Sequence, residues 1–221
     1  MARRDLHGSK VVITGAASGL GRGLALAFAK KRCTILLADI NEAGLKQTCE
    51  MVWNAGGSGE IFDCDVSKLD DVMKMANHCF DAWGKVDILV NNAGVACIGF
   101  LGDIPIANWE WIVSVNFWGV VYGCHAFIPR MKKQTSGHIV NVASAAGFLS
   151  SAEMSPYNAT KAATISISET LKSELAPYNI GVTVLCPTFI RTNLMDTLRF
   201  TEEFQRVSMR FVLMNVGTNL M

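Results

Sequence analysis

Short apolar runs alternate with longer stretches of helical periodicity along the whole chain. The runs are about five residues long and rich in Val, Ile and Leu. Continuous runs of this kind are typical of strands that are buried on both faces, as in a parallel sheet. The predicted strands cover residues 11–14, 34–38, 59–63 (a weaker run), 86–90, 138–142 and 182–186.

The stretches between these runs predict helices on both faces of a doubly wound α/β sheet. Strand and helix alternate six times without a linker or a break in composition, so we expect one domain over residues 1–221. Right-handed crossovers would place helices on both faces of the sheet. Ligands of such sheets bind beyond the carboxyl ends of the strands, which makes the segments after the strands the candidates for chemistry. The predicted helices cover residues 20–31, 42–54, 68–83, 107–132 and 155–176.

Charge and composition argue against several classes of partner. Lys and Arg total 20 against 19 for Asp and Glu, so no basic field exists to attract nucleic acid or anionic lipid. The most apolar long stretch, residues 112–129, contains Ser114, Asn116 and His125 and falls short of a clean membrane span. The seven cysteines are scattered singly, and the N-terminal residues lack a secretion signal. We therefore expect reduced thiols, no metal site and a cytoplasmic location.

A glycine-rich turn follows the first predicted strand and opens a helix. It reads Thr-Gly-Ala-Ala-Ser-Gly-Leu-Gly over residues 14–21, a GxxxGxG spacing that departs from the common GxGxxG form. Glycines let the backbone approach a pyrophosphate closely, and a helix N-terminus offers free N–H groups and a positive dipole end. The turn therefore favours a dinucleotide site; a tight strand-to-helix turn without a ligand is the alternative.

Acidic and amide side chains follow the next three strands. Asp39 could accept hydrogen bonds from an adenosine ribose diol and would repel a 2′-phosphate, or it could cap the next helix, although Asn41 suits that purpose. Asp65 could accept a hydrogen bond from an adenine amino group, or merely start the helix at Ser67. The turn Asn-Asn-Ala-Gly at residues 91–94 could satisfy exposed backbone groups at the strand ends.

Tyr157 and Lys161, which follow the fifth predicted strand, are candidates for acid–base chemistry. Because they are four residues apart, they share one face of a helix. Lowering the pKa of a tyrosine from near 10 by about three units requires roughly 4 kcal/mol. An ammonium about 4–5 Å away, at an effective dielectric near 20, supplies a similar energy. The pair suits proton transfer at neutral pH, although a lone YxxxK also occurs by chance on helix surfaces.

Taken in order, these motifs resemble the short-chain dehydrogenase/reductase family, in the group marked by TGxxxGxG and YxxxK. The matches run from Thr14 to Thr192 and cover most of the chain. The resemblance implies a Rossmann-type fold and an NAD(P)-dependent oxidoreductase that interconverts a secondary alcohol and a ketone. The residues that carry it are the glycine turn, Asp39, Asp65, the Asn-Asn-Ala-Gly turn, Asn116, Ser144, Tyr157, Lys161 and residues 187–192.

The resemblance also implies catalytic roles for Asn116, Ser144, Tyr157 and Lys161. Tyr157 would donate a proton to a carbonyl oxygen during reduction and accept one from a hydroxyl during oxidation. Lys161 would lower the pKa of Tyr157 and bind the nicotinamide ribose, and Ser144 would hold the substrate oxygen. Asn116 would anchor a water through which Lys161 exchanges protons. From the residues alone, a helix kink or an inter-helix hydrogen bond is the simpler interpretation of Asn116.

NAD is the expected cofactor. Relatives that prefer NADP tend to place a Lys or Arg in the glycine turn or directly after the second strand, where this chain has Ser18 and Ile40. Asp39 also favours NAD, whereas Arg22 lies close enough in sequence to weaken the argument. The cofactor-binding residues implied by the resemblance are Gly15, Ser18, Gly19, Leu20, Gly21, Asp39, Asp65, Val66, Asn91, Ala93, Gly94, Tyr157, Lys161, Pro187, Ile190 and Thr192.

The chain departs from the family pattern after about residue 187. Thr188 stands where glycine is usual, which reduces backbone freedom. Family members usually continue through another helix and a last strand, so we expect a truncated substrate-loop and C-terminal region. The alternative function is therefore a dinucleotide-binding sensor or structural subunit with little turnover. For an enzyme, an apolar alcohol or ketone substrate is expected from Phe148, Leu149, Phe189 and Met195.

The resemblance further implies a homodimer. In the family, the helices predicted here at residues 107–132 and 155–176 form a four-helix seam between subunits. Both carry more apolar positions than one sheet face should need. A tetramer is less favoured because the last strand that often builds it is missing. The alternative is that both helices simply pack on this chain's own sheet.

Overall fold

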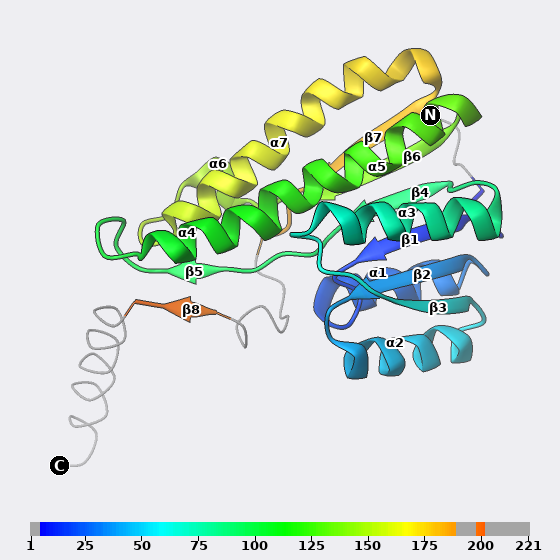
Figure 1. Ribbon diagram of the computed structural model, residues 1–221, viewed down its shortest axis with the longest axis horizontal. Helices are drawn as coiled ribbons and strands as arrows, with labels where there is room; N and C mark the ends of the chain where they lie inside the picture. Colours follow the sequence, from blue (N-terminus) through cyan, green and yellow to red (C-terminus); the bar gives the residue numbers. More distant parts are fainter. Residues whose placement is uncertain (1–4, 189–197, 202–221) are drawn as a thin grey trace.

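A six-stranded parallel sheet forms the centre of the computed structural model, which describes residues 5–188 and 198–201 (Figure 1). The strand order is β3-β2-β1-β4-β6-β7, and every neighbouring pair is parallel. The order reverses beside β1, where doubly wound sheets bind their ligands. The six strands are β1 (Lys10–Thr14), β2 (Thr34–Asp39), β3 (Ser58–Asp63), β4 (Ile88–Asn91), β6 (Gly137–Val142) and β7 (Ile180–Leu185). The predicted doubly wound α/β fold is confirmed.

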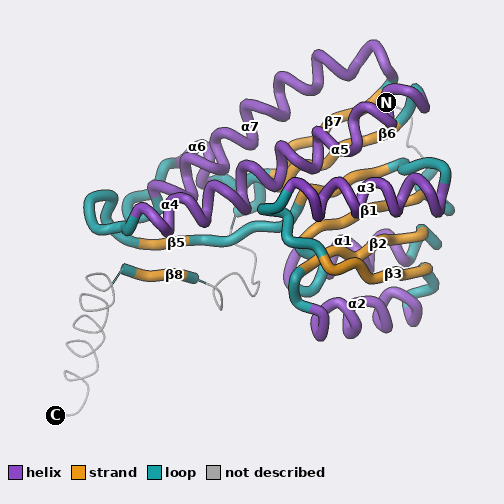
Figure 2. The backbone as a smooth tube through the Cα atoms, in the orientation of Figure 1, coloured by secondary structure: helices purple, strands orange, loops and turns teal. Residues whose placement is uncertain are grey.

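Helices cover both faces of this sheet (Figure 2). The side chains of β1 alternate between two buried clusters: Val12 packs with the helices of one face, and Val11 and Ile13 with those of the other. This alternation explains why the strands read as continuous apolar runs. The first face carries α3 (Leu69–Trp83), α5 (Gly119–Gln134) and α7 (Ser155–Leu175), and the second carries α1 (Gly19–Ala29) and α2 (Glu42–Asn54).

Several short elements were not predicted. The single helix expected at residues 107–132 consists of α4 (Ile106–Val113), a π-helical turn (Ser114–Trp118) and α5. The two-residue strands β5 (Cys97–Ile98) and β8 (Arg199–Phe200) form a second, parallel pair. A four-residue helix, α6 (Ala146–Leu149), precedes α7, and a 3₁₀ turn (Ala176–Tyr178) follows it. Elements this short have no hydrophobic period for a sequence pattern to show.

The helix from Ile106 to Gln134 passes a membrane-span test that residues 112–129 were expected to fail. In length and composition it could cross a bilayer, with a mean hydropathy of 1.4 in its most apolar window. However, 44% of that window is buried inside the protein, and Phe127 and Met131 are fully buried in the core. Since the core helix of a globular protein passes the same test, this single helix is weak evidence for a membrane span.

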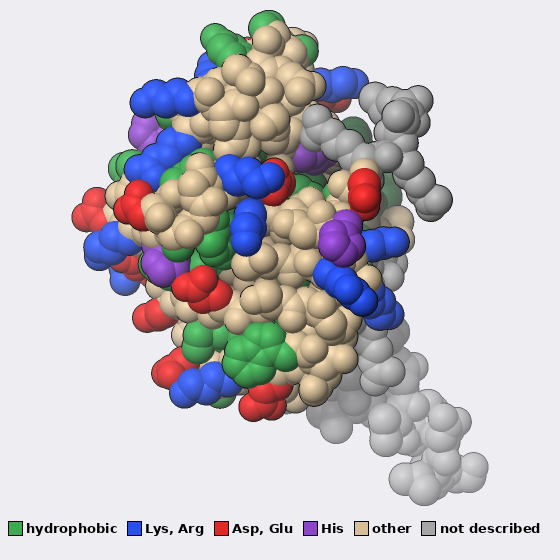
Figure 3. All heavy atoms as spheres, turned by 90° about the vertical axis from the view of Figure 1, so that its right-hand side faces the viewer, with side chains coloured by type: hydrophobic (Ala, Val, Ile, Leu, Met, Phe, Trp, Pro, Cys, Tyr) green, Lys and Arg blue, Asp and Glu red, His purple; other side chains and the backbone are tan. Residues whose placement is uncertain are grey.

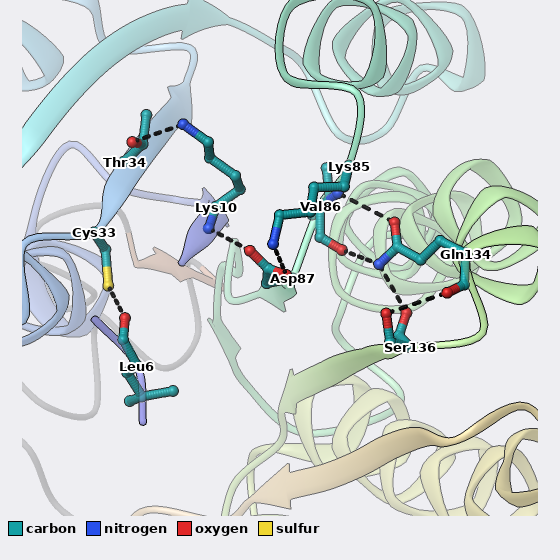
Figure 4. Close-up of polar contacts among 9 residues, drawn as sticks. All are labelled: Leu6, Lys10, Cys33, Thr34, Lys85, Val86, Asp87, Gln134 and Ser136. Carbon is teal, nitrogen blue, oxygen red and sulfur yellow. Dashed lines mark hydrogen bonds and ion pairs between the residues drawn. The ribbon is translucent and has the colours of Figure 1, made fainter. Parts of the chain in front are cut away.

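Polar contacts brace the amino ends of the strands (Figure 4). The Asp87 carboxylate accepts hydrogen bonds from the backbone N–H of Lys10 at 2.8 Å and from the Lys85 ammonium at 2.9 Å. Nε2 of Gln134 donates to the carbonyl oxygen of Val86 at 2.7 Å. Figure 3 shows one end of the molecule, over which basic and acidic side chains are interspersed rather than gathered by sign. The buried polar side chains that could bind a ligand or take part in catalysis lie at the opposite, carboxyl edge of the sheet.

Candidate active site

The backbone of the turn after β1 requires glycine at several positions. Gly15 and Gly19 have φ angles of +67° and +52°, a region that favours glycine. A Cβ atom on Gly15 would lie 2.7 Å from the Cα of Ala93, and one on Gly21 would collide with the carbonyl oxygen of Gly15. Ser18 is the N-cap of α1 but makes no side-chain capping bond. The turn therefore presents backbone without side chains, next to a helix N-terminus that its N-cap leaves open.

Asp39, the last residue of β2, lies beside this turn. Its carboxylate accepts hydrogen bonds from the backbone N–H groups of Ala17 and Asn41, each at 3.0 Å. Asn41 caps α2 through a bond from the N–H of Gly44 at 2.9 Å, so the capping role considered for Asp39 belongs to Asn41. Asp39 thus links the glycine turn to the end of β2.

Asp65 and Val66 follow β3 and make mainly local contacts. The Asp65 carboxylate accepts bonds from the backbone and the hydroxyl of Ser67, at 3.0 and 2.6 Å, and lies 3.3 Å from the Lys68 ammonium. Burial raises the pKa of Asp65, but the Ser67 bonds and the Lys68 charge outweigh it and leave that pKa lowered. Val66 is buried and lies against Gly119 of α5. Asp65 initiates the turn into α3, the simpler of its two predicted roles.

The two asparagines of the turn after β4 point in different directions. Asn91 is buried, and its Nδ2 donates to Oδ1 of Asn141 on β6 at 2.9 Å. Its Oδ1 has no hydrogen-bond partner within the described ranges. The Asn91 side chain therefore links β4 to β6 in the interior, and the geometry gives no support to a side-chain contact with a cofactor.

The sequence analysis quoted Thr14 and Asn92 only as members of their motifs and predicted no contact between them. Nδ2 of Asn92 donates to the carbonyl oxygens of Thr14 and Gly15, at 2.8 and 3.1 Å. The Thr14 hydroxyl in turn accepts the backbone N–H groups of Asn92 and Ala93, at 3.0 and 3.1 Å. These bonds join the glycine turn to the loop after β4. The sequence signal for Asn92 was an amide side chain directly after a strand. Its partners, Thr14 and Gly15, could be identified only once the structure showed that β1 and β4 are neighbours.

Helix α7 places Tyr157 and Lys161 on one buried face, as their spacing predicts. The two side chains are only 9% and 4% exposed. The Lys161 ammonium donates to the carbonyl oxygen of Val142 at 2.9 Å and lies 5.6 Å from the centroid of the Tyr157 ring. Burial lowers the pKa of Lys161 to about 8. Lys161 is therefore a buried ammonium that is easily deprotonated.

The pKa of Tyr157 differs from the sequence-based expectation. Burial raises it above its ordinary value, and the hydrogen bond with the Ser144 side chain lowers it by less. The expected lowering rested on an ammonium about 4–5 Å from the tyrosine, whereas the Lys161 ammonium lies 5.6 Å from the ring centroid and donates to the Val142 carbonyl. In this structure, desolvation dominates the pKa of Tyr157, and the phenol is held in its protonated form.

Asn116 lies fully buried in the π-helical turn. Its Oδ1 accepts the backbone N–H of Val95 at 2.8 Å, and its Nδ2 donates to the Val95 carbonyl at 2.9 Å and to the Thr160 hydroxyl at 3.3 Å. Asn116 thus lies in an irregular helical turn and forms a hydrogen bond to another helix. These are the two features that the sequence analysis gave as the simpler interpretation of this residue. A Cβ atom on Gly94 would lie 3.4 Å from Asn116 Oδ1 and 3.5 Å from Lys161 Nζ, so Gly94 lies beside both side chains.

The segment after β7 is only partly described. The carbonyl oxygen of Pro187 accepts the backbone N–H of Ala145 at 2.9 Å, which joins the end of β7 to the loop that carries Ser144. Ile190 and Thr192 lie outside the described residues, as do Phe189 and Met195. Phe148 and Leu149, expected in an apolar pocket, are on α6 with 66% and 73% of their surfaces exposed.

The carboxyl edge thus brings together two sets of groups. A glycine-lined backbone cradle with Asp39 lies beyond β1 and β2, and Ser144, Tyr157 and Lys161 lie beyond β6 and on α7. The cradle could hold a dinucleotide, and the three side chains could hold and protonate a substrate oxygen. Residues 5–188 and 198–201 contain no group of three or more His, Cys, Asp and Glu placed to bind a metal ion.

Comparison with known proteins shows which sequences this chain is similar to. The model of the short chain dehydrogenase family matches residues 9–203. The oxidoreductase EphD of Mycobacterium tuberculosis is 40% identical over 191 residues, which are 86% of this chain but 32% of EphD, so the chain spans about a third of that relative. A CLA biosynthesis dehydrogenase/reductase of Lactiplantibacillus plantarum is 34% identical over 88% of this chain and 69% of its own length.

A solved structure gives the same result in three dimensions. The crystal structure of a short chain dehydrogenase/reductase from Burkholderia phymatum, in complex with NAD, superimposes with a TM-score of 0.85. The two proteins are 39% identical, and the match covers 88% of this chain and 70% of the other.

Proposed function

The chain belongs to the short-chain dehydrogenase/reductase family, and on that premise we propose that it is an NAD-dependent oxidoreductase that interconverts a secondary alcohol and a ketone by hydride transfer. Tyr157 is the general acid and base of this proposal. The observation that carries it is the buried side chain of Tyr157 at the carboxyl edge of the sheet: its ring centroid lies 5.6 Å from the Lys161 ammonium, and the Ser144 side chain partly offsets the rise of its pKa. A protein that only binds a dinucleotide has no need for this set.

The residues present fit a dinucleotide. Side chains are sterically excluded at Gly15 and Gly21, so a pyrophosphate can approach the backbone and the N-terminus of α1. Lys161 carries three N–H donors, and its side-chain hydrogen bond to a described residue goes to Val142, which leaves donors for a ribose hydroxyl. Bound NAD would supply hydride acceptance and donation; the chain supplies placement and proton handling.

Electrostatics supports NAD over NADP. The Asp39 carboxylate would bind a ribose diol and repel a 2′-phosphate. Arg22, the basic residue that weakened this argument, directs its guanidinium to the carbonyl oxygens of Ala17 and Gly44 and to the Thr48 hydroxyl. Through these bonds Arg22 links α1 to α2. Because its guanidinium already donates to groups of the protein, Arg22 is a poor partner for a phosphate. The NAD complex of the Burkholderia phymatum relative is consistent with this preference.

The protonation states of the chain's own groups favour one direction in the cofactor-free protein. A raised pKa keeps Tyr157 protonated at neutral pH, so the phenol is ready to donate a proton to a ketone oxygen. Oxidation requires the phenolate, so its rate is expected to increase as pH rises. Ser144, whose side chain acts on the pKa of Tyr157, would hold the substrate oxygen beside the phenol.

The test combines binding with turnover. NADH is titrated by its fluorescence, and a panel of secondary alcohols is then screened with NAD. Tyr157→Phe should lower kcat by 10²- to 10⁴-fold while NADH affinity changes by no more than a few-fold, because only the phenol transfers the proton. Tyr178→Phe, which alters a tyrosine outside the site, is the matched control. Tyr157→Phe activity above about a tenth of wild type would exclude this role, and NADH binding without any turnover would favour the sensor or structural subunit.

The proposal extends to assembly and location. Trp118, with 44% of its surface exposed, stacks on Tyr122 with ring centroids 5.5 Å apart, which leaves an aromatic surface on the outer side of the helix. This surface supports a homodimer formed through α5 and α7, a seam with two-fold symmetry. All seven cysteines are free thiols, which is consistent with a reducing, cytoplasmic environment.

A further inference from the structure

The short strand β8 is held beside the loop that follows β4. It pairs in parallel with β5, so that Cys97 is opposite Arg199. The backbone N–H of Arg199 donates to the carbonyl of Ala96, and that of Thr201 to the carbonyl of Ile98, both at 3.2 Å. Figure 1 shows this pair below α4, apart from the central sheet. Two residues of strand need further contacts to be stable.

Arg199 supplies those contacts through its side chain. Its guanidinium carbon lies 3.7 Å from the centroid of the Trp111 ring, and Nη1 donates to Oδ1 of Asn108 at 3.0 Å. Both partners belong to α4. Thr201 is 5% exposed and packs so closely on Gly99 that a Cβ there would collide with the Thr201 side chain. We call the contact of Arg199 with Trp111 and Asn108 the arginine clasp.

The clasped strand is connected to the environment of Tyr157. The backbone N–H of Gly99, directly after β5, donates to the carbonyl oxygen of Glu153 at 2.8 Å, four residues before Tyr157. Glu153 has a φ angle of +65°, a conformation that a non-glycine residue adopts at an energetic cost and that its surroundings must hold. Leu198 precedes Arg199 and packs in the apolar cluster that contains Tyr157. Loss of the arginine clasp would therefore release Leu198 from its contact with that cluster.

Four aliphatic side chains form part of this cluster. Val95, Ala146, Met154 and Leu198 are partly buried and pack against the group of buried residues that contains Tyr157. These residues come from the loop after β4, from α6, from the residue before α7 and from the residue before β8. We call these four aliphatic side chains the wall.

We propose that Arg199 is a positioning residue that holds Leu198 and β8 against the cluster around Tyr157, and that this wall receives the apolar substituent of the substrate. The inference rests on the proposed oxidoreductase function and names its substrate class: secondary alcohols or ketones with a sizeable apolar group. Arg199 acts through Leu198 and does not touch the reacting atoms.

A homologous series of alcohols tests the wall directly. With NAD and 2-butanol, 2-hexanol or 2-octanol, wild-type kcat/KM should rise by up to about fourfold for each methylene that becomes buried. In Arg199→Ala the increase of kcat/KM with chain length should become smaller. KM for 2-octanol should increase by about fivefold or more, because fivefold corresponds to the lowest combined value of an exposed cation–π contact and a hydrogen bond. NADH affinity and kcat should stay within twofold, a split that general destabilisation would not produce.

Arg130→Ala is the matched control. Arg130 also lies over an aromatic ring, with its guanidinium carbon 5.1 Å from the Phe80 centroid, and also donates to an asparagine, Asn77. It lies between α5 and α3, away from the cluster around Tyr157. Arg199→Lys keeps the charge but loses the planar stacking group, so it should recover only part of the wild-type KM. An equal rise of KM in Arg130→Ala, or no rise in Arg199→Ala, overturns the proposal.

Hydrogen exchange separates this inference from the proposed function. In Arg199→Ala, peptides that contain residues 96–99 and 198–201 should exchange faster than in wild type and in Arg130→Ala, because the β5–β8 bonds open more often. Unchanged exchange overturns the clasp, whatever the activity. If wild type turns over no member of the alcohol panel, the oxidoreductase proposal fails and the substrate wall with it. Faster exchange would then still support the clasp.

Discussion

Replacing Lys161 with methionine should reveal that the lysine destabilises the cofactor-free fold. Burial lowers its pKa from 10.5 to about 8, and each pKa unit corresponds to 1.36 kcal/mol, so burial of the ammonium costs about 3 kcal/mol at pH 7. Lys161→Met removes this cost but also removes the hydrogen bond to the Val142 carbonyl. The pH dependence separates the two effects, because only the cost of burying the charge titrates with Lys161.

The direction in which the free energy of unfolding changes with pH follows from proton binding to Lys161. Between pH 8 and 10.5 the unfolded chain keeps a proton on Lys161 that the folded protein has lost, so raising the pH stabilises the folded state. The free energy of unfolding of wild type, relative to Lys161→Met, should rise by about 1 kcal/mol between pH 7 and 9 and by about 2 kcal/mol by pH 10. For a chain of this length, 1 kcal/mol corresponds to about 2–4 °C in Tm.

Urea unfolding of both proteins at several pH values provides the measurement. Lys172→Met, which removes an exposed lysine from the same helix, controls for the loss of one positive charge. Cys186 interacts electrostatically with Lys161, so the comparison is repeated in a Cys186→Ser background. A difference between wild type and Lys161→Met that stays flat or falls from pH 7 to 10 would refute the conclusion that burial destabilises the Lys161 ammonium.

Two further predictions concern the cofactor and the assembly. Asp39→Asn keeps the side-chain shape and removes the charge, so the ratio of kcat/KM for NAD to that for NADP should fall by about tenfold, equivalent to 1.4 kcal/mol; an unchanged ratio would place the discrimination elsewhere. Val121→Glu introduces a charge on the half-buried outer side of α5 and should dissociate the homodimer before the protomer unfolds. Light scattering at micromolar concentration tests this, and a monomeric wild type would end the dimer proposal.

Periodicity was sufficient to predict the central sheet. The predicted strand at residues 34–38 is β2 without its last residue, and the predicted helix at residues 42–54 is α2. Such elements bury apolar side chains along their whole length, which leaves a pattern in the sequence. The β5–β8 pair is instead stabilised by contacts between residues about a hundred positions apart, such as Arg199 and Trp111. No local pattern encodes a contact of that range.

The resemblance and the residue spacing led to the site, but they could not describe its internal bonds. The motif Asn-Asn-Ala-Gly was recognised as one unit, yet Asn91 turns into the core and Asn92 holds the glycine turn. The difference arises because successive residues at a strand end face opposite sides. Thr14, read only as part of the glycine motif, receives the backbone of the neighbouring loop.

The electrostatics of Tyr157 and Lys161 depends on a third element that their spacing does not include. Four residues of helix bring the side chains together, and a Coulomb estimate then predicts a lowered tyrosine pKa. In the folded chain, however, the end of β6 presents the Val142 carbonyl to the ammonium, and both groups are almost completely removed from water. Desolvation acts against the charged form of each group, so the pKa of the lysine falls and that of the tyrosine rises. The same burial that positions the pair therefore keeps the phenol protonated in the cofactor-free protein. Reversing that state requires positive charge or hydrogen-bond donors close to the phenolic oxygen, the place where a nicotinamide ring would bind.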